Sequence, residues 1–364
     1  MQKIIAVLTL FFHLNFLTNL SVCDNIGTEV EVQQDQCNAD DQTCIEKLKI
    51  ERESINQGIK IARGSNLEGR PPPVTFDECT DRHKNCVQYE GRGECHKNPG
   101  WMIVHCAKSC NACHLRDAKV RCQRSALNIS TEPIYKPGDL NWMFANIAEE
   151  FPHFGITVIS TDPWIVTFDN FLSDEEIHAL ISTNEGKWER STDSGTMNEF
   201  GETGRKLSTG RTSSNAWCRH ECLNNPHVQN VMNRIEEVTK VPKNHYENFQ
   251  VLQYDIGQRY NTHHDMSERQ VKLTPGPRIL TFFLYLSDVE EGGETAFPQL
   301  GYEVKPRKGK ALLWPSVMDD NLEQQDPRTN HEAKAVIRGK KYAANAWIHL
   351  YDYRVSNLWG CTGT

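Results

Sequence analysis

The hydrophobic pattern of the chain changes near residue 160, where short apolar runs replace a largely polar sequence. The run from Trp164 to Leu172 is typical of a strand, and Ser173-Asp-Glu-Glu176 has the form of a capping box that opens a helix toward Ile181. Strand-like runs separated by Gly, Pro, Asp and Asn then follow: Gln250 to Tyr254, Ile279 to Leu286, Tyr302 to Val304, Ala311 to Trp314, Ala333 to Ile337 and Tyr342 to Tyr351. This pattern predicts an α+β domain over residues 161–355, an all-β sandwich or jelly roll with a layer of helices.

The residues outside this domain divide into a leader and polar segments. Lys3 precedes an apolar run, Ile4 to Phe12, that is shorter than a membrane span. We therefore expect residues 1–23 to be a cleaved signal peptide, with an uncleaved anchor as the alternative, and we expect no stable membrane span elsewhere. The remaining segments have few apolar residues and are interpreted as two linkers, the first with some helix, and a C-terminal tail: residues 24–75, 114–160 and 356–364.

Six cysteines lie between the two linkers in a segment with almost no aliphatic run. They are Cys79, Cys86, Cys95, Cys106, Cys110 and Cys113. So few apolar side chains cannot form a core, so we expect three disulfides to hold this unit together, with a zinc site as the competing interpretation. Further along, Cys218 and Cys222 are close enough to pair across a tight turn or to bind a metal.

The spacing of these six cysteines resembles the ShK toxin-like (ShKT) domain over residues 76–113. That resemblance implies the pairings Cys79 to Cys113, Cys86 to Cys106 and Cys95 to Cys110. Because the unit is fused to a much larger domain, we expect it to be an accessory domain that contacts a protein partner.

Charge and targeting features narrow the functional classes. The 40 basic and 48 acidic residues give a net charge of −8, so we do not expect binding to nucleic acid. Cleavage after Cys23 would leave 12 of the 13 cysteines, an even number that suits an oxidising compartment. We therefore expect the endoplasmic reticulum lumen or secretion, with Asn128 in Asn128-Ile-Ser130 as a glycosylation acceptor.

Candidate metal ligands occur in the strand-rich region. His263 and Asp265 are two residues apart, so in a strand their side chains point to the same face, and His331 can supply a third ligand from another strand. Two imidazoles and one carboxylate leave positions open for a co-substrate and oxygen, as in non-haem Fe(II) sites.

A lysine close in sequence adds a second element of chemistry. Alternation along the strand that begins at Lys341 predicts one face with these side chains: Lys341, Ala343, Asn345, Trp347 and His349. If the opposite face packs on the helical layer, Lys341 is buried, and a buried ammonium needs an anionic partner. A ligand carboxylate would meet that need.

Several motifs in this region resemble the prolyl 4-hydroxylases, which are Fe(II)- and 2-oxoglutarate-dependent dioxygenases with a double-stranded β-helix fold. The motifs cover roughly residues 163–352 in the family's order: Tyr254-x-x-Gly-Gln-x-Tyr-x-x-His263-x-Asp265, Gly276-Pro-Arg278, Tyr285 to Pro298, Lys305 to Trp314, and His331 with Lys341. The chain departs from the commonest pattern at Ala335, Tyr342 and Asn345, which puts the peptide preference in doubt.

The resemblance implies a role for each matching residue. His263, Asp265 and His331 would bind Fe(II), and Lys341 would bind the distal carboxylate of 2-oxoglutarate. Tyr254 and Thr295 would assist that carboxylate, and three residues would line the peptide-proline site: Arg278, Trp347 and His349.

The activity implied is 4-hydroxylation of peptidyl proline in secretory-pathway proteins, with O2 consumed and succinate and CO2 released. L-ascorbate is expected to restore oxidised iron. The alternatives are the same chemistry on lysyl side chains or a small molecule, a secreted ShK-type binding protein with an inactive fold, and a zinc hydrolase. Whether a protein disulfide isomerase subunit is needed stays open.

Overall fold

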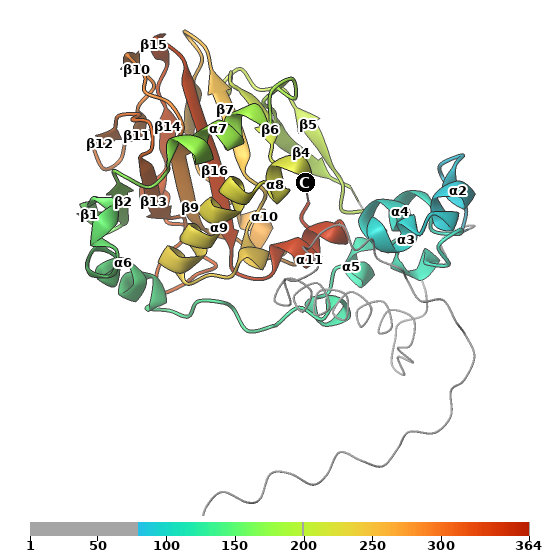
Figure 1. Cartoon of the computed structure of the whole chain (residues 1–364). Helices are drawn as coiled ribbons and strands as arrows, with labels where there is room; N and C mark the ends of the chain where they lie inside the picture. Colours follow the sequence, from blue (N-terminus) through green and yellow to red (C-terminus); the bar gives the residue numbers. More distant parts are fainter. Residues whose placement is uncertain (1–78, 199, 364) are drawn as a thin grey trace, which may run out of the picture. The chain divides into compact units, whose positions relative to one another are not determined.

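Two antiparallel β-sheets form the centre of the fold (Figure 1). The structure is a computed structural model that describes residues 79–198 and 200–363, so the predicted signal peptide and the predicted first linker lie outside the described residues. The larger sheet contains, in spatial order, β1 (Ile156–Thr161), β2 (Trp164–Phe168), β13 (Ala311–Pro315), β9 (Arg278–Tyr285), β16 (Lys341–His349), β7 (Gln250–Tyr254), β6 (Ser214–Trp217) and β3 (Glu189–Arg190). The smaller sheet contains β12 (Tyr302–Val304), β11 (Thr295–Phe297), β14 (His331–Ala333) and β8 (Tyr260–His263).

Side chains of both sheets share one apolar interior. Leu252, Phe283 and Trp314 from the larger sheet pack with Phe297 and Val304 from the smaller sheet. Two short pairs of strands complete the β-structure: β10 (Glu291–Gly292) with β15 (Val336–Arg338), and β4 (Asp193–Met197) with β5 (Thr203–Lys206). The arrangement confirms the predicted jelly roll, and the predicted strand over Ala333–Ile337 is divided between β14 and β15.

Helices cover the outer face of the larger sheet (Figure 1). They are α6 (Asp139–Glu150), α7 (Asp174–Ser182) and α9 (Pro226–Thr239), with the short α8 (Glu221–Asn224) before α9. The predicted capping box starts α7, since Ser173 Oγ accepts from Glu176 N and Glu176 accepts from Ser173 N. Alternation in β16 is confirmed, because Ala344, Ala346 and Ile348 pack with the helices whereas Ala343 faces the interior.

Residues 114–160 are not a linker, and this prediction is wrong. The segment contains α5 (Ala118–Arg121), α6 and β1. Helix α6 buries one face, formed at helical spacing by Leu140, Met143, Phe144 and Ile147. The low overall apolar content of the segment concealed this pattern.

The predicted C-terminal tail is also part of the fold. Helix α11 runs over Tyr353–Leu358, and Trp359 and Cys361 after it are buried. Cys361 forms a disulfide with Cys122, which joins the end of the chain to α5. Cys218 and Cys222 pair with each other as a second disulfide.

The cysteine-rich unit consists of α2 (Cys86–Gly91), α3 (Glu94–Lys97) and α4 (Pro99–His105). Its six cysteines form the pairs implied by the ShKT resemblance: Cys79–Cys113, Cys86–Cys106 and Cys95–Cys110. Disulfides rather than a zinc site therefore hold this unit. Among the described residues, no helix is both long and apolar enough to cross a bilayer.

Loss of the Cys122–Cys361 disulfide is expected to destabilise the fold strongly. This bond closes a loop of 239 residues and therefore restricts the unfolded chain, so the C122S/C361S variant should lose about 2–5 kcal/mol of unfolding free energy. The C218S/C222S variant, whose bond spans four positions, is the matched control and should lose less. Denaturant titration measures the unfolding free energy of both variants. A larger loss in C218S/C222S than in C122S/C361S would contradict the expected ranking.

Candidate metal and co-substrate site

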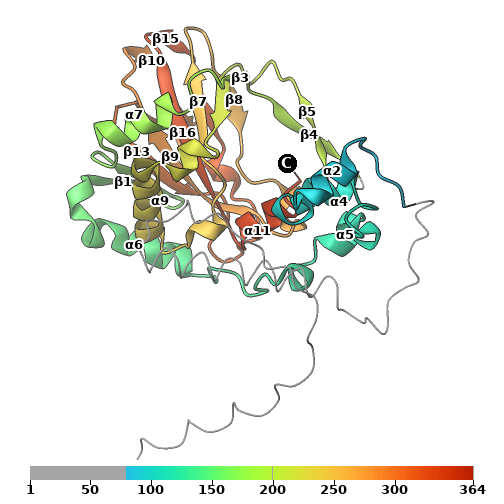
Figure 2. The ribbon, with the colours of Figure 1, turned by 45° about the vertical axis from the view of Figure 1, so that its right-hand side comes forward.

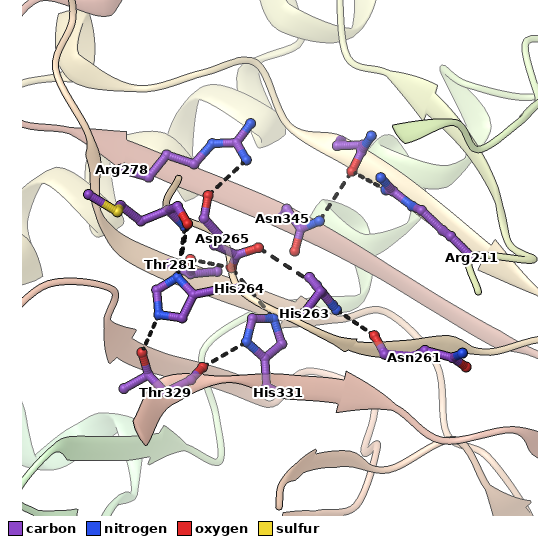
Figure 3. A network of polar contacts seen from close by, with 12 residues as sticks. Arg211, Asn261, His263, His264, Asp265, Arg278, Thr281, Thr329, His331 and Asn345 are labelled. Carbon is purple, nitrogen blue, oxygen red and sulfur yellow. Dashed lines mark hydrogen bonds and ion pairs between the residues drawn. The ribbon is translucent and has the colours of Figure 1, made fainter. Parts of the chain in front are cut away.

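The metal-ligand candidates converge because two strands of the smaller sheet pair in a particular register. His331 in β14 lies directly opposite His263 in β8, which brings the two rings to 4.3 Å between centroids. Asp265 was expected in the same strand as His263, but β8 ends at His263 and Asp265 lies in the bend that follows. The bend still directs its carboxylate toward both rings (Figure 3).

The geometry of these three side chains fits a metal ion. One donor atom from each lies within 4.8 Å of the others, and Asp265 is 3.8 Å from His263 Nε2 and 3.6 Å from His331 Nε2. Nδ1 of His263 donates to the Asn261 carbonyl at 2.9 Å, and Nδ1 of His331 donates to the Thr329 carbonyl at 3.0 Å. Because each Nδ1 carries its proton, each Nε2 has a free lone pair directed at the centre of the set.

Electrostatics keeps His263 and Asp265 in their metal-binding protonation states. Burial, with the neighbouring His331, lowers the pKa of His263 to about 3. Burial opposes ionisation of Asp265, but His331, His263 and Arg278 outweigh it and hold the pKa of that carboxyl well below its usual value. Thr281 Oγ1 fixes the carboxylate by donating to Oδ2 at 2.6 Å. At neutral pH the site offers the Asp265 carboxylate and the neutral imidazole of His263, which together with His331 form a set suited to Fe(II) with open coordination positions.

Lys341 is fully buried where β16 pairs with β7. It lies next to a cavity that is lined by His263, His331 and Tyr254. Its Nζ donates to the Gly293 carbonyl at 2.7 Å and lies 5.3 Å from the ring of Tyr254, which lines the cavity. Thr295 also lines the cavity, and its hydroxyl accepts from Tyr285 at 2.8 Å. One carbonyl does not neutralise an ammonium, so this pocket is prepared for a carboxylate beside Tyr254 and Thr295.

The remaining predicted residues form a group next to Asp265. Arg278 Nε donates to Glu247 Oε1 at 2.6 Å, its Nη1 donates to the Asp265 carbonyl at 3.3 Å, and its guanidinium lies 3.7 Å from the centroid of the Trp347 indole. His349 is buried and contacts Glu247 Oε1 at 2.9 Å, so it orients Glu247 and does not line an open surface. Burial opposes ionisation of Glu247, but Arg278 and His349 outweigh it and lower the pKa of Glu247 to about 2.

Four contributors to the site were missed from the sequence. Glu247 holds Arg278, and Thr281 holds Asp265. The Tyr260 ring stacks on His263 at 3.5 Å between centroids, and Arg211 lies 4.7 Å from the Tyr260 ring. None of the four had a local signal in the sequence. Residues i and i+3 of a regular strand face opposite sides, and Tyr260 reaches His263 where the pairing of β8 with β14 is irregular. The other contacts depend on strand pairing over long separations.

Comparison with known proteins decides the family. A model of the 2OG-Fe(II) oxygenase superfamily matches residues 249–349, and an ShK domain-like model matches residues 78–113. "Probable prolyl 4-hydroxylase 3" of Arabidopsis thaliana is 36% identical over 222 residues, which cover 54% of this chain and 73% of that protein. The chain belongs to the prolyl 4-hydroxylase family.

Two other prolyl hydroxylases are similar to parts of this chain. "Prolyl 4-hydroxylase subunit alpha-2" of Caenorhabditis elegans is 33% identical over 200 residues, which cover 53% of this chain and 35% of that protein. The crystal structure of a viral collagen prolyl hydroxylase from Paramecium Bursaria Chlorella virus-1 with 2OG is 28% identical, with a TM-score of 0.39 and coverage of 51% of this chain and 95% of that chain. Family membership makes Fe(II) and 2-oxoglutarate the groups that the two parts of this site would hold.

Binding of 2-oxoglutarate to this family member is expected to take up protons above neutral pH. Burial lowers the pKa of Lys341 to about 7, so near pH 8 most of the free enzyme carries a neutral lysine. A bound carboxylate favours the charged form, so binding raises the pKa and affinity falls as pH rises above about 7. Below that pH the lysine is already charged, and proton uptake disappears.

Calorimetry of the metal-loaded enzyme under anaerobic conditions measures this uptake. Titrations near pH 8 in two buffers of different ionisation enthalpy should give different heats. Lys341→Arg is the control, because its guanidinium stays charged and should show equal heats. Equal heats for the wild type would contradict the pKa assignment.

Proposed function

We propose that the protein hydroxylates C4 of proline residues in peptide or protein substrates of the secretory pathway. One oxygen atom of O2 enters the substrate and the other enters succinate, with CO2 released from 2-oxoglutarate. The observation that carries this proposal is that a complete His263–Asp265–His331 set and the buried cation Lys341 border the same interior of the jelly roll.

The residues of the chain have separable tasks in this reaction. An Fe(II) ion bound by the three ligands supplies the oxidising chemistry, with open positions for 2-oxoglutarate and O2. Lys341 neutralises the far carboxylate, with Tyr254 and Thr295 beside it. Arg278 and Trp347 present a stacked guanidinium and indole next to Asp265, where they support docking of a peptide.

The alternatives explain fewer of these features. An inactive fold gives no reason for a full ligand set in which both Nδ1 protons are already held by carbonyls. A zinc hydrolase leaves Lys341 without a purpose. Oxidation of lysyl side chains or of a small molecule would use the same metal and co-substrate pockets. It would differ only in the contacts made with the substrate.

Substrate oxidation assays distinguish these functions. Purified protein with Fe(II), 2-oxoglutarate and ascorbate is offered proline-rich peptides and matched peptides with alanine in place of proline. Mass spectrometry should show a gain of one oxygen on proline, with succinate formed in equal amount. Oxygen gained on lysine would redirect the proposal, and no turnover by iron-loaded protein would exclude it.

We also propose that the protein acts in the endoplasmic reticulum lumen or after secretion, with ascorbate as reductant of iron. The five disulfides among the described residues support an oxidising compartment. Asn128 is exposed in the acceptor sequence Asn128-Ile-Ser130, which supports glycosylation there. An endoglycosidase-sensitive mobility shift that Asn128→Gln abolishes would test both points, and an unmodified secreted protein would contradict the glycan.

A further inference from the structure

The β4–β5 hairpin borders the site on two sides. At its base, the Thr192 carbonyl accepts from Arg211 Nη1 at 3.4 Å, and Arg211 packs over the Tyr260 ring that stacks on His263. In β4, the Gly195 carbonyl accepts from Arg269 Nη1 at 3.1 Å, and Arg269 belongs to α10 (Glu268–Val271), which follows Asp265. The hairpin is therefore linked through Arg211 to the strand that carries His263, and it contacts the short helix that follows Asp265.

The hairpin has little support of its own. Its two strands pair only with each other and join neither main sheet. A two-stranded hairpin is marginally stable in water. Met197 is 40% exposed, and Leu207 directly after β5 is 73% exposed, so the hairpin buries few of its own apolar side chains. The position of the hairpin therefore depends on the contacts of its tip, the turn between β4 and β5.

The ShKT domain holds that tip directly. Figure 2 shows β4 and β5 extending from the sheets toward α2 and α4. The Arg82 guanidinium lies 4.1 Å from the centroid of the Phe200 ring, and His105 Nε2 of α4 lies 3.2 Å from Glu202 Oε1. Phe200 and Glu202 belong to the turn between the two strands.

The C-terminal segment holds the tip from a second direction. The buried Arg121 donates to the Phe200 carbonyl at 2.7 Å and to the Trp359 carbonyl at 2.9 Å. Thr203 Oγ1 donates to the Gly363 carbonyl at 2.8 Å. The Cys122–Cys361 disulfide joins the residue after Arg121 to this same segment. The contacts of the tip thus come from the ShKT domain, α5 and the chain end.

We propose that the ShKT domain and the disulfide-bonded C-terminus clamp the β4–β5 hairpin as a wall of the peptide site. This inference rests on the proposed peptide substrate. Because the clamped hairpin is already ordered, peptide binding does not have to supply the free energy of ordering it. The clamp therefore sets the affinity for the peptide without changing the metal site or the 2-oxoglutarate pocket. Arg82 and Glu202 are positioning residues, because they act on the peptide only through the hairpin.

A double variant, Arg82→Ala with Glu202→Gln, tests the clamp. It removes the cation–π contact of Arg82 with Phe200 and the carboxylate that Glu202 presents to His105 Nε2, while the glutamine keeps a side-chain oxygen that can accept from Asn198 Nδ2. The disulfides, Arg121 and the metal site are left unchanged. Amide hydrogen exchange of residues 193–206 should accelerate. The KM for a proline-rich peptide should rise by about fivefold, the effect of two such surface contacts, with kcat and the KM for 2-oxoglutarate unchanged.

Lys308→Ala is the matched control, since it removes another exposed ion pair, with Asp174, that touches neither the hairpin nor the ShKT domain. It should change none of these quantities. Unchanged amide hydrogen exchange in the hairpin would overturn the clamp. Faster exchange with an unchanged KM for the peptide would also overturn it, as would a KM for 2-oxoglutarate that rises in parallel. Failure of the wild type to hydroxylate any peptide would overturn the proposed function instead, and the exchange data would still decide whether the hairpin is held.

Discussion

Replacing His331 with alanine is expected to lower peptide hydroxylation more than 100-fold and to reduce iron binding in parallel. The variant removes one of the three candidate ligands found among the described residues, and loss of a residue that merely orients a ligand already costs about 10–100-fold in affinity or activity. His331 packs with His263 and Trp314, so a small loss of stability should accompany the change.

The measurement is iron content after anaerobic reconstitution, together with succinate release on the same samples. His178→Ala is the matched control, because His178 is exposed on α7 and far from the metal set in the sequence. It should bind iron and turn over like the wild type. Full iron occupancy in His331→Ala would contradict the assigned ligand set.

Replacing Lys341 with methionine is expected to raise the KM for 2-oxoglutarate by about 150- to 5,000-fold. Removing one partner of a buried charge pair costs about 3–5 kcal/mol. Stability should change in the opposite direction, because burial of the free ammonium penalises the folded protein and lowers the pKa of Lys341. Methionine removes that penalty and keeps the apolar stem.

Lys340→Met is the control for this variant. Lys340 is the adjacent residue, but its side chain is exposed and pairs with Asp255 at 3.1 Å. Its KM for 2-oxoglutarate should match that of the wild type, since exposed ion pairs contribute little. The assignment of Lys341 fails if Lys341→Met keeps a KM within about threefold of the wild type while the protein remains folded.

Lys341 and His331 also show which features of the site could be predicted from the sequence. Lys341 could be placed on the interior face because β16 alternates strictly, and Ala344, Ala346 and Ile348 do pack on the helices. His331 could be proposed as a ligand, but its position directly opposite His263 depends on the pairing of β14 with β8. No local pattern determines pairing across 68 residues of sequence.

The missed features share a physical cause. Glu247 follows a short turn before β7, and its importance comes only from Arg278 and His349, which reach it through the folded sheet. Arg121 resembles any surface arginine in a polar segment, yet it is buried among carbonyls from three parts of the chain. Such residues are recognised by their long-range partners, which hydrophobic periodicity does not reveal.

If this chain couples oxidation of 2-oxoglutarate to hydroxylation of peptidyl proline, the two atoms of O2 are divided between succinate and the peptide, and labelled oxygen measures that division. The reaction is run under 18O2 with a proline-containing peptide, and both products are analysed by mass spectrometry. Coupled hydroxylation predicts one labelled oxygen at C4 of proline and one in succinate, with neither product formed by His331→Ala. Labelled succinate with an unmodified peptide, or hydroxyproline whose oxygen comes only from water, would contradict it.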